Sequence, residues 1–392
     1  MCREQNLSID EKFLFRKRIT GGFSRRSLIA SLVLLVCCQS SLHAEVGPAP
    51  DRLKDSIQKG VTFLKSNQSE DGTWTSPTSL GITAIATHAL LVSGVPVSDP
   101  TVQQGLKVLE SHQQPDGGVY HPNSKLKNYE SSLAVMAFAS ANADGRYNAA
   151  IEKAIAYLKE IQWDEKEIGE GKGNVAFGGA GYGSHSRPDL SNTTFFLEAM
   201  KAAGISSHDA AVQNALVFVS RCQNLPSEHN TTEHADKVKD GGFYYTVAAG
   251  GSSQAGTNPD GGLRSYASMT YAGLKSMIYA GVNPDDPRVK AAESWIRKFY
   301  TLKENPGMGQ QGLYYYYQMF AKALETLGSH QFVDASDVSH DWRKELAEQL
   351  FSEQKANGSW VNENPRWLEG DPNLTTAYAL ISLSRCHSPA VK

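Results

Sequence analysis

The feature that most constrains this chain is a unit that recurs between residues 51 and 387. Each unit contains a helical stretch, a Gln, a Gly-rich turn that ends in an aromatic residue, and a second helical stretch rich in small residues. The first unit passes through Gln68 and the turn Asp71–Trp74. A weaker fifth unit has Pro306–Gly309 in place of the Gln and the aromatic turn. The Gln recurs as Gln113, Gln162, Gln223 and Gln354. Such a period indicates one supersecondary motif stacked many times.

Two kinds of helix alternate in these units. The first stretch of a unit is amphipathic, with apolar residues at helical spacing such as Ile151, Ile155 and Leu158. The second stretch is apolar around its whole circumference, which is typical of a buried helix. The six second stretches begin near Leu80, Tyr129, Leu190, Tyr266, Leu313 and Leu374. An amphipathic outer shell around an apolar inner shell predicts an all-α (α/α)6 toroid, a double-ring helical barrel, rather than an open solenoid.

The toroid is expected to occupy residues 45–392 as a single domain of six helix-pair repeats. An inserted Gly-rich loop at residues 239–262 is long for a turn, and long insertions on one face of a repeat protein are often functional. Cys222 and Cys386 are the cysteines of this segment. They can form one disulfide or remain two buried thiols.

Residues 1–44 have the pattern of an export signal peptide. Arg25 and Arg26 precede a short apolar stretch, Leu28–Cys38, and Ala44 supplies a small residue for cleavage. The segment Ser24–Ile29 also resembles a bacterial twin-arginine signal. The sequence therefore predicts an exported protein, periplasmic or extracellular, that starts at Glu45.

Charge and hydropathy exclude two classes of protein. Removing residues 1–44 takes away 7 basic and 3 acidic residues from 38 and 41, which leaves 31 basic and 38 acidic residues, a net charge of about −7. A chain with this balance and no long basic run is not expected to bind nucleic acid. No stretch after residue 44 is apolar enough for an integral membrane span.

One string of residues resembles a known repeat. Lys59–Gly60, Phe63–Leu64, Gln68 and Gly72–Trp74 are similar to the QW repeat of squalene-hopene and oxidosqualene cyclases, which protein prenyltransferase β-subunits share more loosely. The resemblance covers almost all of residues 51–387 and implies an α/α toroid with a central cavity. It implies no single chemistry, because such toroids host cyclases, prenyltransferases, thioester domains and polysaccharide lyases.

The acid motif of these cyclases is Asp-x-Asp-Asp-Thr. A segment of this chain resembles the motif in its position and spacing, but two of the three acidic residues are replaced. Asp189 begins the matching segment, but Ser191 stands where the proton-donating Asp would be and Asn192 where the next Asp would be. A hydroxyl group cannot protonate an alkene, so Asp189 and Ser191 are expected first of all to cap a helix. His185 and Arg187 precede them in a loop at the predicted mouth, where His185, Arg187 and Asp189 are the candidates for anion binding or proton transfer.

The metal chemistry of prenyltransferases is not expected. The comparable inner helix, Leu263–Tyr271, contains no His or Cys to hold zinc. The Gly-Cys-Gly-Glu-Gln turn of thioester domains is absent as well. The sequence predicts no metal site and no cofactor.

Polar and aromatic residues at the starts of the inner helices are the candidates for ligand binding. Aromatic faces stabilise cations and stack on apolar or sugar ligands, but buried tyrosines also seal packed seams. Only one or two of the consecutive residues Tyr314–Tyr317 can face the cavity. The candidate set is Tyr129, Glu130, Ser191, Asn192, Arg264, Tyr266, Tyr314, Tyr315, Tyr316 and Asp371.

Three functions are compatible with these features. The first is binding or transformation of a hydrophobic, isoprenoid-like small molecule in the central cavity. The second is a non-catalytic toroid that holds a protein or cell-surface partner. A polysaccharide lyase or hydrolase is a weaker third, since it needs paired carboxylates or an Arg/Tyr base in an open groove.

Overall fold

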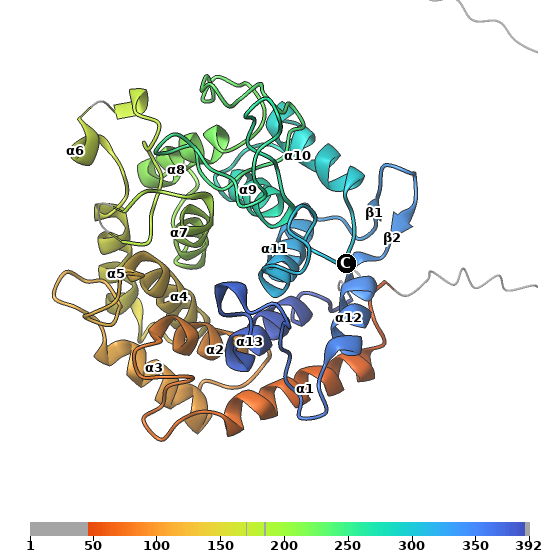
Figure 1. The fold of residues 1–392 in the computed structure, drawn as a ribbon. Coiled ribbons are helices and arrows are strands. Elements are labelled where there is room, and N and C mark those ends of the chain that lie inside the picture. Colours follow the sequence, from red (N-terminus) through yellow and green to blue (C-terminus); the bar gives the residue numbers. More distant parts are fainter. Residues whose placement is uncertain (1–45, 170, 184–185, 389–392) are drawn as a thin grey trace, which may run out of the picture. The chain divides into compact units, whose positions relative to one another are not determined.

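A computed structural model describes residues 46–169, 171–183 and 186–388, and its long helices form two rings, one inside the other (Figure 1). The predicted signal peptide and His185 lie outside the described residues. The inner ring consists of α2 (Leu80–Val92), α4 (Lys127–Ser140), α7 (Leu190–Ala202), α9 (Ala267–Tyr279), α11 (Leu313–Thr326) and α13 (Pro372–Leu383). The outer ring consists of α1 (Pro50–Ser66), α3 (Pro100–Ser111), α5 (Asn148–Glu160), α8 (Ala210–Arg221), α10 (Pro287–Lys298) and α12 (Trp342–Glu353). The predicted all-α toroid is confirmed.

Short elements fill the connections between the helices. They are α6 (Glu165–Ile168), the 3-10 turns η1 (Gly171–Gly173) and η2 (Arg366–Leu368), and a hairpin of β1 (Phe332–Val333) and β2 (Ser339–His340). The two strands of the hairpin pair antiparallel, with Phe332 opposite His340. The 222–266 connection includes the predicted Gly-rich insertion and is held by isolated bridges such as Thr246 to Ser252.

Local sequence explains where the outer helices begin. Asp99, Asp209 and Asp286 each accept a hydrogen bond from the backbone N–H two residues later, which satisfies a donor that the helix leaves unpaired. Pro100 and Pro287 then occupy the first helical position, where a missing N–H costs nothing. The inner helices start within two residues of the predicted positions.

The inner ring closes on itself. Each inner helix packs against the next one along the chain, and α13 packs against α2, the first inner helix. The outer helices cover the seams, as α3 does between α2 and α4 and α1 between α13 and α2. Inner-helix residues such as Leu133, Phe196 and Leu380 belong to one continuous hydrophobic core. The described residues from 46 onward therefore form a compact unit with its own closed core.

The glutamine of each unit joins neighbouring repeats. Gln68 donates one N–H to the carbonyl oxygen of Gly72 in its own turn (3.0 Å) and another to that of Thr101 in α3 (2.9 Å). Gln113, Gln162 and Gln223 repeat this pattern toward α5, α8 and α10. Gln354 donates to Ser56 in α1 (3.0 Å) and so connects the last repeat to the first.

At the junction between α10 and α12, where the unit lacks its Gln, a different contact forms. The Tyr300 hydroxyl donates to the Glu345 carboxylate of α12 (2.9 Å), and the Ala335 N–H donates to the carbonyl oxygen of Arg297 (3.0 Å). The weak fifth unit is therefore joined to its neighbour by one side-chain contact and one backbone contact that the repeat pattern does not contain.

The turn glycines also belong to these junctions. Gly358 has φ +89°, and a Cβ placed there would lie 2.4 Å from the carbonyl oxygen of Lys59 in α1. Gly178 is similarly close to the backbone of Asn214 in α8. Glycine is required both for the left-handed conformation and for the close approach of the next outer helix.

The inner helices are less uniformly apolar than their sequence pattern suggests. Glu198 of α7, Lys275 of α9 and Lys322 of α11 are all buried, and both ammonium groups donate to the Glu198 carboxylate. Burial favours a higher pKa for Glu198, but the two lysines outweigh it and hold the pKa at about 2. Burial lowers the pKa of Lys322 to about 8, against the opposing effect of Glu198. The ion pairs of this buried charge cluster connect three inner helices, α7, α9 and α11.

The two cysteines of the toroid are free, buried thiols, and burial raises the pKa of each one. Cys222 directly follows the last residue of α8, and Cys386 follows α13. Of the two states that the sequence left open, the structure has the reduced one.

Replacing Gly358 by Ala is expected to destabilise the fold more than replacing Gly94 by Ala. Both residues have positive φ, but nothing lies within 4 Å of a Cβ at Gly94. The Gly94 variant should lose about 1 kcal/mol of unfolding free energy through backbone strain alone. The Gly358 variant should lose about 1–3 kcal/mol more through overpacking. Denaturant unfolding of both variants measures the difference, and equal losses would contradict a packing role for Gly358.

Replacing Glu198 by Gln should lower the unfolding free energy by about 3–5 kcal/mol at pH 7, because two buried ammonium groups lose their counter-ion. The folded-state pKa of Glu198 is depressed, so its stabilisation is present above the unfolded pKa and is lost as the pH falls toward 2. The difference in unfolding free energy between wild type and variant should therefore become smaller as the pH falls from 5 to 2. Glu325→Gln, which removes a half-buried pair with Arg385, is the control and should cost about 1 kcal/mol or less.

Candidate functional site: a pocket at one end of the inner ring

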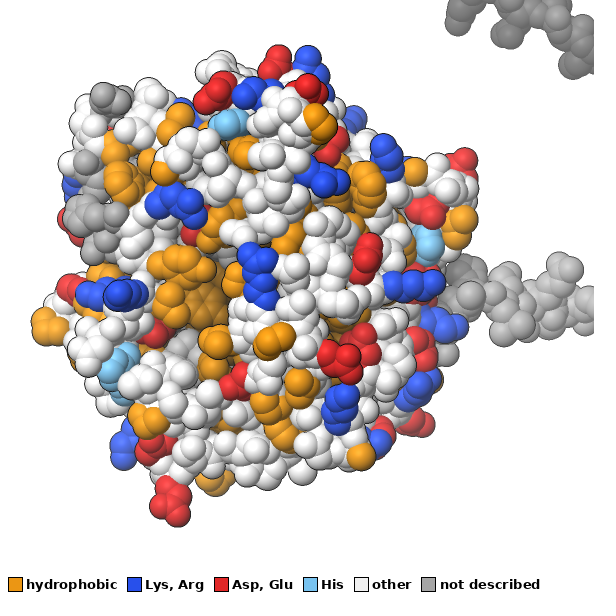
Figure 2. Space-filling model, in the orientation of Figure 1, with side chains coloured by type: hydrophobic (Ala, Val, Ile, Leu, Met, Phe, Trp, Pro, Cys, Tyr) orange, Lys and Arg blue, Asp and Glu red, His pale blue; other side chains and the backbone are white. Residues whose placement is uncertain are grey.

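A cavity of about 500 Å³ opens where the N-terminal ends of the inner helices converge. All six inner helices contribute residues from their first two turns, such as Ile82 of α2, Phe195 of α7 and Met269 of α9. Connecting segments supply the remaining wall, including Tyr182, Tyr245 and Gln254. Figure 2 shows an apolar hollow on this face with basic side chains around it. The volume lies in the range typical of small-molecule sites.

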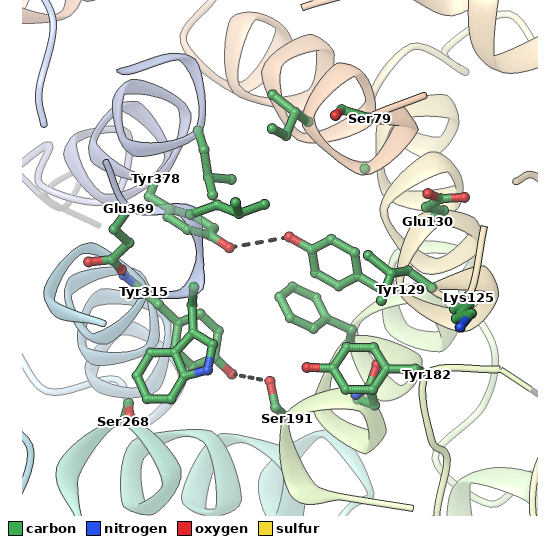
Figure 3. A pocket seen from close by; sticks show the side chains of 18 of the residues that line it. Ser79, Lys125, Tyr129, Glu130, Tyr182, Ser191, Ser268, Tyr315, Glu369 and Tyr378 are labelled. Carbon is green, nitrogen blue, oxygen red and sulfur yellow. Dashed lines mark hydrogen bonds between the residues drawn. The ribbon is translucent and has the colours of Figure 1, made fainter. Parts of the chain in front are cut away.

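Aromatic rings form much of the wall (Figure 3). The hydroxyl groups of Tyr129 and Tyr378 lie 3.2 Å apart, and a second bridge of 3.3 Å joins Ser191 to Tyr315. The Phe195 ring packs edge-on against Tyr129, with centroids 4.9 Å apart. These contacts join side chains from different inner helices and fix the positions of the rings relative to one another.

Two carboxyl groups line the pocket on opposite sides in Figure 3. Glu130 accepts hydrogen bonds from the His121 N–H (3.0 Å) and the Ser124 hydroxyl (2.8 Å). Glu369 accepts hydrogen bonds from the N–H groups of Tyr314 and Tyr315 and so caps α11. Burial raises the pKa of each carboxyl group to about 7.

Asp189 caps helix α7, as expected. It is 1% exposed and accepts hydrogen bonds from the backbone N–H (2.9 Å) and the side-chain amide (2.8 Å) of Asn192. Burial raises its pKa to about 6, although the hydrogen bonds from Asn192 oppose this shift. Asp189 is not part of the pocket wall, whereas Ser191 and Asn192 face the cavity.

Six of the ten candidate ligand-binding residues lie in the pocket wall: Tyr129, Glu130, Ser191, Asn192, Tyr266 and Tyr315. The other four lie elsewhere. Asp371 caps α13 and accepts a hydrogen bond from the Thr75 hydroxyl, and Arg264 is exposed on the 222–266 connection. Tyr316 donates to the carbonyl oxygen of Thr301, and Tyr314 packs edge-on against Tyr317.

The two remaining candidates flank the pocket or fall outside the described residues. Arg187 is exposed, and its guanidinium lies 5.7 Å from the ring centre of Tyr245, a pocket residue. His185 is not described. Among the described residues no three His, Cys, Asp or Glu side chains are grouped closely enough to hold a metal ion.

Sequence reasoning missed several pocket residues. Tyr378 comes from the second turn of α13, and Tyr245 comes from within the Gly-rich insertion. Glu369 and Trp367 belong to the connection before α13. In that connection the sequence pattern pointed to Asp371 as the ligand-binding residue. A spacing rule could have found Tyr378, which lies four residues after the wall residue Leu374 on the same helical face.

Comparisons with known proteins agree with this architecture. The family model described as squalene-hopene cyclase C-terminal domain matches residues 75–247, less than half of the chain. No curated protein sequence matches the chain.

Among solved structures, a type II terpene cyclase from Scytonema is 15% identical with a TM-score of 0.50, over 86% of this chain and 98% of that one. Candida albicans protein geranylgeranyltransferase-I, complexed with GGPP, is 12% identical with a TM-score of 0.51, over 84% and 90%. A polysaccharide lyase is 9% identical with a TM-score of 0.52, over 86% and 96%. At such identities the likeness concerns the fold. The family model and the fold together show that the chain is similar to terpenoid cyclases and protein prenyltransferases in its α/α toroid.

Replacing Glu130 by Gln should change how stability depends on pH. The folded-state pKa of Glu130 is raised, so the wild type loses stability as the pH rises from about 4.5 through 7 and the buried carboxyl group ionises. Gln keeps the shape and does not titrate. The unfolding free energy of the variant relative to wild type should therefore increase between pH 5 and pH 8, by about 2 kcal/mol. A pH-independent difference would contradict a buried, titrating Glu130.

Proposed function

We propose that residues 45–392 bind a hydrophobic, isoprenoid-like molecule in the pocket at the N-terminal ends of the inner helices. The observation that carries this proposal is the aromatic wall, in which Tyr129, Phe195, Tyr315 and Tyr378 are held in place by their mutual contacts. A pre-formed apolar cavity binds an apolar ligand without first having to order its own side chains. The comparison structures support the proposal, because one of them is a terpene cyclase and another is complexed with GGPP.

The carboxyl groups in the wall are better suited to hydrogen-bonding a ligand than to starting a carbocation reaction by protonating an alkene. Protonating an alkene requires an unusually strong acid, whereas burial raises the pKa of Glu130 and Glu369 to about 7. A carboxyl group that is partly protonated at neutral pH can donate or accept a hydrogen bond to a ligand hydroxyl. We therefore propose binding without proton-initiated cyclisation, with Ser191 in the place of the cyclase acid. Export through the signal predicted in residues 1–44 is part of the same proposal.

A sugar-cleaving function has less support from this pocket. A tyrosine base would need a lowered pKa, but burial raises the pKa of all six tyrosines in the wall. The two wall carboxyl groups are also engaged with backbone N–H groups. The alternative function, non-catalytic binding of a partner protein, would give the pocket no role.

Thermal unfolding with candidate ligands tests the proposal. Squalene, polyprenyl diphosphates or hopanoids should raise the melting temperature of residues 45–392, with about 2.7 kcal/mol of stabilisation at a ligand concentration of 100 Kd. Ser191→Trp should abolish the shift, because Ser191 is a wall residue and an indole would occupy the cavity. Ser294→Trp, an exposed position on α10, is the matched control and should keep the shift.

Two outcomes would count against the proposal. If none of the apolar ligands shifts the wild-type melting temperature, binding of an isoprenoid-like molecule is rejected. If acidic oligosaccharides shift it and apolar ligands do not, the polysaccharide alternative replaces it.

A further inference from the structure

One histidine is held between two carboxylates at the junction of α10 and α12. His340 ends strand β2, and its Nδ1 lies 2.9 Å from Oε1 of Glu345 in α12. Its Nε2 lies 3.2 Å from Oδ2 of Asp334, which directly follows β1. The side chain of His340 is 17% exposed, and its ring packs on that of Tyr300 with centroids 4.1 Å apart. His340 therefore joins the β1–β2 hairpin to an outer helix at the edge of the ring (Figure 1).

These two contacts require a charged imidazole. An ionised carboxylate only accepts hydrogen bonds, and a neutral imidazole has a single N–H. A neutral His340 can therefore satisfy Glu345 or Asp334 but not both, and its ring lone pair would face the other carboxylate. The imidazolium ion has an N–H on each nitrogen and donates to both. Hydrogen bonds from the backbone N–H of Val338 and from the His340 ring hold the pKa of Asp334 below its usual value, so this carboxylate is ionised at neutral pH.

The two carboxylates have His340 as their cationic partner. In the described part of the chain, the salt bridges of Asp334 and Glu345 are both formed with His340. The Tyr300 hydroxyl donates to Glu345 (2.9 Å) as a neutral group. The other charged groups on the neighbouring segments are exposed or have partners of their own: Glu293, Arg297, Asp337, Asp341, Arg343 and Lys344.

Protonation of His340 is coupled to folding. Burial by itself would lower the pKa of His340, but the hydrogen bonds and negative charges of Asp334 and Glu345 outweigh it and raise the pKa above its usual value. A raised folded-state pKa gives stabilisation that is fully present below the unfolded pKa of about 6.5 and is lost as the pH rises through the folded-state pKa. The contact between the hairpin and α12 is therefore strongest in mildly acidic solution.

We propose that His340 is a proton-dependent clamp, which fastens the hairpin to α12 when the imidazole is charged and releases it when the proton is lost. The clamp lies at the junction where the repeat has no glutamine. The other junctions use glutamine amide groups, which do not titrate, so this pH dependence is confined to one place in the ring. His340, Asp334 and Glu345 lie outside the pocket wall, so the clamp operates without a pocket ligand.

Histidine NMR of residues 45–392 tests the charge state directly. Between pH 5 and pH 9, His340 should keep both ring protons to a higher pH than His208, an exposed histidine before α8. The signal of His340 is assigned by its loss in His340→Gln. Glu345→Gln removes one of the two acceptor charges, so it should lower the titration midpoint of His340. Glu348→Gln, which removes an exposed pair with Arg52 from the same helix, is the matched control and should leave the midpoint unchanged.

Hydrogen exchange measures whether the proton holds the hairpin in place. After correction for intrinsic exchange rates, the protection of amides 332–340 in the wild type should fall between pH 5.5 and pH 8.5. The fall should be about tenfold for each unit by which the folded-state pKa of His340 exceeds that of the unfolded chain. The turn at residues 71–74, which Gln68 holds, should keep its protection and is the internal control. His340→Gln should give low hairpin protection at both pH values, whereas His208→Gln should behave as the wild type.

Two results would overturn the proposal. One is a titration midpoint of His340 that is no higher than that of His208. The other is hairpin protection that does not fall in the wild type, or that falls equally in His340→Gln. The titration is measured on the wild type, so it decides the matter even if circular dichroism shows that a variant is unfolded. Neither measurement uses a pocket ligand, so a failure here is distinguishable from a failure of the proposed function.

Discussion

The paired hydrogen bonds of the repeat glutamines are the interaction on which the rest of the structure depends. Each glutamine holds its own Gly turn with one N–H bond and reaches the next outer helix with another, as Gln68 does between Gly72 and Thr101. Gln354 applies the same geometry between the last repeat and the first, through Ser56. Because the inner helices are buried on nearly every side, they are stable only when each seam between them is covered, and a closed ring covers the seams without leaving an open end.

The location of the pocket follows from this closure. Six inner helices point the same end toward one face, so residues from their first two turns converge there and line a common space. Glu369, which caps α11, and Glu130 supply polar groups to this wall, while the first helical turns also supply aromatic rings such as Tyr129 and Tyr315. The pocket thus combines a hydrogen-bonding edge with an apolar interior.

Polarity changes along the axis of the inner ring. Exposed apolar residues such as Leu126 and Leu368 lie at the mouth of the pocket, and aromatic residues form the wall behind them. Glu198, Lys275 and Lys322 lie seven residues beyond Ser191, Ser268 and Tyr315 on the same three helices, which is two turns further from the mouth. A buried ion cluster is a costly way to join helices, but it admits few alternative packings, so we associate it with the specificity of the ring rather than with its stability.

The sequence by itself determined the helix pairs, their inner and outer roles and their starts to within two residues, because periodicity, caps and turn glycines act over a few neighbouring residues. It also brought Tyr129, Ser191 and Tyr315 into the candidate set. Only the tertiary structure decided which residues of Tyr314–Tyr317 face the cavity, since the rotation of α11 is set by its packing between α9 and α13. The same holds for Glu369, which reaches α11 from the next repeat, and for the strained turn at Trp367 and Leu368. Contacts across more than fifty residues depend on how the ring closes, and no local pattern encodes that geometry.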